Sequence, residues 1–190
     1  MTTKTRDYLA YETLKDGRTV LVRAIRPQDK CLLAEGMHHL SKQSLYCRFF
    51  IYKDSLSEKE LDYFTKVDFV KHVALIVGFY ENGQFSPAGT GRYIVSTAPE
   101  EAGSAEFALT VAEEYQRLGF GTMLLQHLAR IARDNGVKVL IGLVLPENIK
   151  MLNLVSHSGL PFKRTIDSGG EWDIRINLTQ QVDAAKDKSS

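Results

Sequence analysis

The chain has 190 residues, of which 44% are hydrophobic, and its 24 basic and 23 acidic residues give a formal net charge of +1. This composition suits one domain with a substantial core, and no apolar run approaches the roughly 18 residues that a membrane-spanning helix needs. The near-neutral charge argues against a general nucleic-acid-binding protein, whose basic surface normally shows as a net excess.

Cysteine and histidine spacing indicates neither a disulfide framework nor a metal site. The two cysteines are Cys31 and Cys47, and the five histidines show no spacing that pairs with them as zinc ligands. No basic region followed by an apolar run marks a signal peptide. We therefore expect a cytoplasmic protein with no bound metal and no membrane or nucleic-acid partner.

The first part of the chain predicts one strand and two helices. Residues 19–25 alternate like a strand, Pro27 suits a first helical turn, and an apolar face at helical spacing covers residues 32–40. Ser57 and Glu60 form a capping-box pattern, which predicts the start of the second helix.

A meander of three strands follows. Strand-like runs at residues 73–80 and 88–95 are joined through Asn82-Gly83, a pair that favours a hairpin turn. The third strand is expected at residues 106–111. The remaining predicted elements are a helix from Gly121 to a stop at Asn135-Gly136, a strand at 137–145, a helix after Asn148, and a closing hairpin with strands at 162–166 and 171–178.

These elements predict one domain at residues 19–178. Residues 1–18 are expected to be an N-terminal extension, and residues 179–190 a polar, disordered tail. The pattern shows no internal repeat.

The segment from Glu106 to Gly121 constrains function most, because an apolar strand leads into a glycine-containing turn and a helix. Gly119 and Gly121 let the backbone approach a phosphate without a Cβ, and the free amides of the first helical turn attract negative charge. A P-loop needs a lysine between Gly121 and Thr122, and none is present. A dinucleotide fold needs a third glycine and a downstream acid, which this segment also lacks. Taken alone, the glycine pair also suits an ordinary turn.

Gln116, Gly119 and Gly121 follow a strand that begins with a carboxylate, and this arrangement resembles the acyl-CoA-binding motif of the GNAT acyltransferase family. Residues 148–152 resemble the second motif of that family. The resemblance covers roughly residues 19–178. It implies the α/β (α+β) GNAT fold, a mixed, mostly antiparallel sheet of about seven strands flanked by four helices.

Three upstream segments resemble one GNAT subgroup, the protein lysine acetyltransferases related to bacterial Pat. These segments are residues 26–27, 40–50 and 67–69. The resemblance implies acetyl-CoA as the co-substrate and a protein lysine, for example in an acyl-CoA synthetase, as the acceptor.

The same resemblance makes Glu106 the general base that removes the amine proton, directly or through water. It also implies that the strand separates from its neighbour near Leu109 and Val111, leaving backbone amides for pantetheine and the thioester carbonyl. Without the family, Glu106 is an exposed strand glutamate, and Leu109 and Val111 are ordinary core residues.

Further acyl-CoA contacts are implied at the turn and the helices on either side of it. With Leu109 and Val111, the predicted cofactor-binding residues are Gln116, Arg117, Gly119, Phe120, Gly121, Thr122 and Asn148. Arg117 and Thr122 would contact phosphate oxygens, although an exposed arginine is otherwise simply solvated. Asn148 otherwise suits a helix cap.

One departure from the family concerns the leaving thiolate. Many GNAT enzymes protonate it with a tyrosine at the position of Val155. Ser156 and His157 are neighbours of that position, but helical rotation is expected to turn them away from it. Protonation by water is the remaining expectation.

Arg48, Asp68 and His72 are the candidate acceptor-binding residues by the same analogy, although each also suits a structural salt bridge or a solvated loop. We hypothesise an acetyl-CoA-dependent N-acetyltransferase that works by direct attack in a ternary complex. Acetylation of a small amine or an amino acid is one alternative, and a non-catalytic acyl-CoA-binding module is another.

Overall fold

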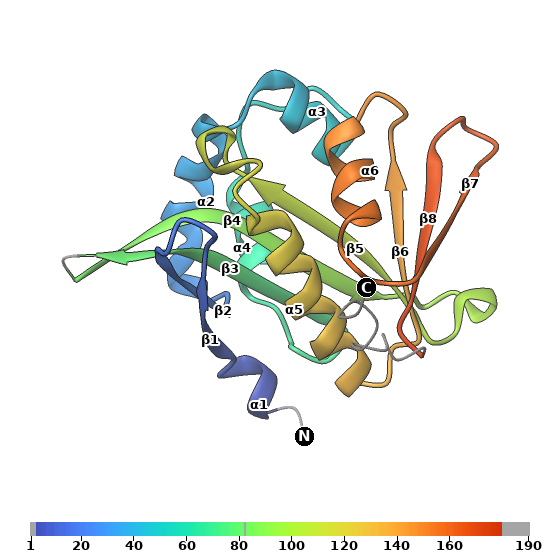
Figure 1. Ribbon diagram of the computed structural model, residues 1–190, viewed down its shortest axis with the longest axis horizontal. Helices are drawn as coiled ribbons and strands as arrows, with labels where there is room; N and C mark the ends of the chain where they lie inside the picture. Colours follow the sequence, from blue (N-terminus) through green and yellow to red (C-terminus); the bar gives the residue numbers. More distant parts are fainter. Residues whose placement is uncertain (1–2, 82, 180–190) are drawn as a thin grey trace, which may run out of the picture.

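A computed structural model describes residues 3–81 and 83–179, in which one eight-stranded sheet forms the centre of the molecule (Figure 1). The strand order is β1-β2-β3-β4-β5-β6-β8-β7, and neighbouring strands are antiparallel except for the parallel pair β5 and β6. The strands are β1 Leu9–Thr13, β2 Thr19–Ala24, β3 His72–Glu81, β4 Gln84–Val95, β5 Ser104–Val111, β6 Val139–Val144, β7 Phe162–Ile166 and β8 Trp172–Asn177.

Helices cover both faces of this sheet. Figure 1 shows α5 and α6 on one face and α2 and α4 on the other, with α3 at the edge between the two groups. The α-helices are α1 Thr3–Arg6, α2 Lys30–Gly36, α3 Lys42–Phe49, α4 Glu58–Thr65, α5 Phe120–Asp134 and α6 Ile149–Ser156. Short 3-10 turns are η1 Pro27–Asp29, η2 Met37–His39, η3 Pro99–Glu101 and η4 Glu113–Tyr115.

The main core lies between the sheet and α5. Alternate residues of β3 point toward this helix, so Val73, Leu75 and Val77 are fully buried. Gly91 of β4 lets the helix approach closely, because a Cβ there would lie 2.9 Å from Cδ1 of Leu128. Removing this apolar surface from water supplies most of the driving force for folding.

A smaller apolar cluster lies on the other face, under α2 and α4. It consists of Ala24, Ile25, Val67, Phe69 and Ala74. This face also buries charged and polar side chains, so it is less uniformly apolar than the α5 face.

The predicted strands and helices are confirmed in their order and type. The capping box is confirmed too: Ser57 Oγ accepts from the Glu60 N–H, and the Glu60 carboxylate accepts from the Ser57 N–H. The strand predicted at 88–95 begins earlier, at Gln84. The register shifts between Val77 and Gly78, where Ala88 of β4 is the extra residue. This bulge lets the neighbouring Pro87 lie inside the strand, because a bulge relieves the need for a proline N–H. Asn82 of the predicted turn lies outside the described residues.

Two elements lie where none was predicted. β1 lies within the predicted N-terminal extension and pairs with β2, so the sheet has eight strands rather than about seven. α3 forms between the two helices predicted for the first part of the chain: Ser41 caps its start, and Phe50, with φ of 60°, ends it. The tail at residues 180–190 lies outside the described residues. Within the described ranges no helix has the length and apolar character to cross a bilayer, and the cytoplasmic location stays a prediction.

Candidate active site

The two central strands β5 and β6 separate directly after Glu106. They pair in parallel over three residues of β5, the last of which is Glu106. On the other side of β5, the Ala112 N–H donates to the Ala88 carbonyl at 2.9 Å. Since alternate residues of a strand direct their backbone groups to opposite sides, the N–H groups of Leu109 and Val111 point into the gap beside β6.

The turn between β5 and α5 leaves the first amides of the helix free. Arg117 and Gly119 both have left-handed backbones, with φ of 64° and 99°. Gly119 is the N-cap and provides no side-chain hydrogen bond, and the first helical bond is from the Met123 N–H to the Gly119 carbonyl at 3.0 Å. The N–H groups of residues 120–122 therefore have no helical partner and are suited to bind an anion.

Gly121 is needed for packing as well as for access. A Cβ at this position would lie 2.3 Å from Cδ1 of Leu154, so the close contact between α5 and α6 already favours glycine. Phe120 is 1% exposed, and its ring packs against Phe79 and Tyr115. Any contact of Phe120 with a ligand therefore comes from its backbone.

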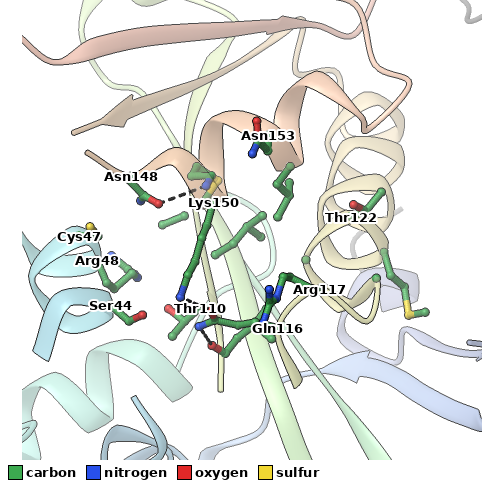
Figure 2. Close-up of a pocket in the computed structure, with 18 of the residues that line it drawn as sticks. Ser44, Cys47, Arg48, Thr110, Gln116, Arg117, Thr122, Asn148, Lys150 and Asn153 are labelled. Atoms are coloured by element: carbon green, nitrogen blue, oxygen red, sulfur yellow. Dashed lines mark hydrogen bonds between the residues drawn. The ribbon is translucent and has the colours of Figure 1, made fainter. Parts of the chain in front are cut away.

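A cavity of about 1620 Å³, which we call the acyl cavity, follows the gap between β5 and β6 toward α5 and α6. Figure 2 shows side chains from α3, α5, α6 and the turn converging on such a pocket. Of the predicted residues, the acyl cavity brings together Arg48, Glu106, Leu109, Val111, Gln116, Arg117, Gly119, Gly121, Thr122 and Asn148.

A chain of polar contacts crosses the acyl cavity. Lys150 reaches from α6 to the Gln116 side-chain oxygen at 2.5 Å, as Figure 2 shows, and donates to Glu113 at 3.3 Å. Glu113 also accepts from Ser41 and Ser44 at the start of α3. Partial burial works to raise the pKa of Glu113, but the hydrogen bonds from Ser44 and Ser41 outweigh it and hold the pKa at about 2. This carboxylate therefore links α3 to the pocket wall.

Asn148 has the helix-cap geometry that was one of its two interpretations. Its side-chain oxygen accepts from the Met151 N–H at 3.1 Å, which satisfies one free amide of α6. The Asn148 NH₂ group has no hydrogen-bond partner among the described residues, and Asn148 lines the acyl cavity. The cap and a ligand contact are thus compatible.

Glu106 is exposed and lies beside Arg48 of α3. Burial lowers the pKa of Arg48, and the negative charge of Glu106 works against that shift. Both residues line the acyl cavity, and no ion pair within 4.0 Å joins them. Glu106 is therefore open to a second cation, such as an amine.

A second cavity, of about 640 Å³, lies on the α2 and α4 face of the sheet, and we call it the arginine cavity. Arg48, Phe49 and Thr110 line both cavities, so the two adjoin. Arg92 of β4 is 5% exposed and lines the arginine cavity. Burial lowers the pKa of Arg92 to about 9, and the positive charge of Arg48 adds to the shift. Arg92 stays charged at neutral pH.

His72 lies behind Arg92 and lines neither cavity. Burial, and then the positive charge of Arg92, lowers the pKa of His72 to about 4. Its Nε2 lies 3.3 Å from Nη1 of Arg92, and because arginine only donates, Nε2 is the acceptor. Asp68 accepts from three backbone N–H groups at 2.8 Å and also lines neither cavity. The structure thus places both residues outside the lining of the two cavities, and their role at the acceptor stays a prediction.

Val155 stands at the position of the family tyrosine, and valine cannot donate a proton. It is 1% exposed and packs in the core. Ser156 donates back to the Leu152 carbonyl. His157 lines the acyl cavity, with its Nδ1 2.8 Å from the Asn153 carbonyl oxygen. Among the described residues, no group of three or more histidine, cysteine or acidic side chains is arranged to hold a metal ion.

Three polar residues that line the two cavities or bond to their walls were missed by the sequence analysis. Arg92 stands among apolar residues in a strand-like run, which is an unusual place for a charge and is the signal that marks it. Lys150 lies two residues after Asn148 in the second motif. Glu113 carries no local signal, because its partners are 37 to 72 residues away in the sequence.

Comparison with known proteins gives concordant results. The model of the acetyltransferase (GNAT) family matches residues 37–159. Acetyltransferase PA5475 of Pseudomonas aeruginosa is 30% identical over 167 residues, which are 88% of this chain and 88% of that protein.

Solved structures show the same fold. The GNAT domain of S. lividans PAT is 33% identical and has a TM-score of 0.78, over 89% of this chain and 96% of that one. A GNAT acetyltransferase from Streptococcus pneumoniae, 17% identical, has a TM-score of 0.62 over 83% of this chain and 98% of that one.

Proposed function

Because the chain belongs to the acetyltransferase (GNAT) family, we propose that it transfers the acetyl group of acetyl-CoA to an amine, with Glu106 as the general base. The acceptor that we propose first is a protein lysine. The observation that carries this proposal is the position of Glu106, which lies where β5 and β6 separate and lines the acyl cavity.

The acyl cavity supplies the features that acetyl-CoA needs. The free amides of residues 120–122 suit the diphosphate, and Gln116 and Asn148 suit the amide groups of the pantetheine arm. An acetyltransferase-like protein from Salmonella typhimurium has been solved with its cofactor acetyl-CoA, and its fold is the same at 16% identity with a TM-score of 0.66.

The reaction itself is an acyl transfer by direct attack. A free lysine has a pKa of about 10.4, so exposing its neutral amine at pH 7 costs on the order of 4 to 5 kcal/mol unless a base takes the proton in place. Glu106 takes that proton as the C–N bond forms, and the Leu109 and Val111 amides stabilise the developing oxyanion. The C–S bond then breaks, and water protonates the CoA thiolate.

Three observations support a protein acceptor. The S. lividans PAT domain is 33% identical over nearly its full length, and the three segments upstream of the meander resemble Pat-type lysine acetyltransferases. Aromatic and aliphatic side chains at residues 50–52 are exposed close to Arg48, with Tyr52 at 85%. Such a rim suits contact with a protein surface better than contact with water.

The proposal is tested by thiol release from acetyl-CoA with a lysine-containing peptide, with a polyamine and with no acceptor. We expect release that depends on the peptide. Release with the polyamine alone would favour a small-amine acetyltransferase. Saturable binding of acetyl-CoA without any release would replace catalysis with a binding module.

A further inference from the structure

We propose that the arginine cavity is the acceptor subsite and that Arg48 and Arg92 bind a carboxylate of the acceptor there. This inference rests on the proposed acetyl transfer and adds a substrate class. The acceptor carries an amine, which reaches Glu106, and a carboxylate close to it, which reaches the two arginines.

Arg92 is a buried cation with unused donors. Its Nη1 contacts the Phe64 carbonyl at 3.4 Å and His72 Nε2 at 3.3 Å, and its guanidinium lies 4.2 Å from the Phe64 ring centroid. Its other guanidinium nitrogens have no hydrogen-bond partner among the described residues. They are not sealed from solvent, and Arg92 lines the cavity. These donors are therefore available to a ligand.

The protein does not neutralise this charge. No carboxylate of the described residues lies within 4.0 Å of Arg92. Its hydrogen-bonding partner His72 is neutral, and a ring face and a carbonyl offset the charge only in part. Burying a cation without a counter-ion is costly, so an anionic ligand would be stabilised at this position.

Arg48 strengthens the positive potential of the same cavity. It also has no ion pair among the described residues, and it stands on the wall shared with the acyl cavity. Glu35 and Glu114 line the arginine cavity too, but both are exposed, and Glu114 lies 2.9 Å from His39. The acids are thus at the rim, whereas Arg92 lies deep, and a low-dielectric wall focuses its field.

The sheet register sets the distance between the two ends of the acceptor. Arg92 lies opposite Ala108, and Glu106 is two residues along the same strand. Side chains at such positions share one face of the sheet, with α-carbons about 7 to 8 Å apart. A short acceptor spans this distance. A guanidinium matches a carboxylate with two parallel hydrogen bonds, which favours a carboxylate over a simple halide ion.

The carboxylate has two possible sources, which matched acceptors distinguish. The first pair is free lysine and lysinamide. The second pair is a peptide with one lysine next to a glutamate and the same peptide with glutamine. We expect kcat/KM to be about tenfold or more higher for the acid in at least one pair. The pair that responds identifies the source as a free amino acid or an acidic neighbour in a peptide.

Variants link the preference to the arginines. In Arg92→Gln we expect the KM for the acidic acceptor to rise about tenfold or more, the acid-to-amide preference to fall toward one, and the KM for acetyl-CoA to stay unchanged. Arg48→Gln gives the same readout from a less buried position if Arg92→Gln does not fold. Arg164→Gln, on the exposed face of β7, is the matched control.

The two proposals fail separately. Thiol release that is equal for acid and amide in both pairs, or a preference that survives in both variants, overturns the carboxylate subsite and leaves acetyl transfer standing. If no acceptor releases thiol, acetyl transfer fails. In that case the subsite is tested by binding of glutarate, a dicarboxylate. Glutarate should raise the melting temperature of the wild type more than that of Arg92→Gln, and equal shifts would overturn the subsite too.

Discussion

The two faces of strands β3 to β5 use the same backbone for different purposes. On the α5 face, alternate residues such as Val73, Leu75 and Val77 are apolar and fully buried. On the α2 and α4 face, β3 places His72 beside the buried apolar residues Ala74 and Ile76, and β4 adds the buried Arg92. The first face is stabilised by packing, whereas the second holds buried charges with incomplete partners.

This difference shows where chemistry can reside in the fold. A close-packed apolar face tolerates neither water nor charge, so it fixes the position of the strands. The opposite face leaves a cavity of about 640 Å³ beside the point where β5 and β6 separate. The rigid face therefore holds the strands that present Glu106 and Arg92 on the other side.

The largest effect is expected from breaking the buried Arg23–Asp29 ion pair on the α2 and α4 face. Arg23 and Asp29 join through two contacts of 2.7 Å, and Asp29 also accepts from the Arg26 N–H. Asp29→Ala leaves the Arg23 cation buried and unpaired, so we expect a loss of about 3 to 5 kcal/mol of unfolding free energy in urea denaturation.

The matched control for this change is Asp16→Ala. Asp16 and Arg18 are also 2.7 Å apart, but both side chains are 46% exposed. Water solvates the charges there, so little change is expected. Equal losses in the two variants would mean that burial does not distinguish the pairs.

A pH dependence of stability should come from His72. Its pKa is about 4 in the fold against an ordinary 6.5. As the pH falls below 6.5, His72 becomes protonated in the unfolded chain but stays neutral in the folded protein until about pH 4. The free energy of unfolding therefore falls by about 3 kcal/mol across that window. Above pH 6.5 His72 contributes no slope.

His72→Gln should remove this part of the slope in denaturation curves measured from pH 7 to 4. Burial also lowers the pKa of His127, on the α5 side, so the variant keeps a second contribution of the same sign. A variant with the full wild-type slope would show that burial and the charge of Arg92 do not hold His72 neutral.

Glu106→Gln tests the residue that we propose as the general base. The amide keeps the shape of the side chain but cannot take a proton, so we expect turnover to fall about 100-fold or more at neutral pH. The affinity for acetyl-CoA, measured by calorimetry, should change little. Glu100→Gln, an exposed acid on η3, is the control. Undiminished turnover would remove the base assignment.

Local patterns predicted most of the α5 face. Alternation marked the strands, the stripe after Gly121 marked α5, and the Ser57 and Glu60 pair marked the start of α4. β1 was missed because it is only five residues long and lies half exposed at the edge of the sheet. Its sequence therefore shows no apolar–polar alternation stronger than that of a polar loop.

The α2 and α4 face was harder to predict for a physical reason. A buried charge depends on partners from distant segments, and no local rule identifies them. Arg48 was assigned to the acceptor side by resemblance, and the structure places it at the wall of both cavities. Asp68 was assigned in the same way, but its three backbone donors come from the next four residues, so a local turn explains it.

The smallest expected effect separates two reasons for the glycine at position 121. Gly121→Ala places a Cβ against Leu154, and the double variant with Leu154→Ala removes that contact. We expect the two substitutions to be non-additive by about 1 kcal/mol in unfolding free energy, since each relieves the other. If the phosphates need the bare backbone, acetyl-CoA affinity stays low in the double variant. Recovery of affinity would assign Gly121 to helix packing alone, and the anion site would then rest on the free amides and the left-handed turn at Arg117 and Gly119.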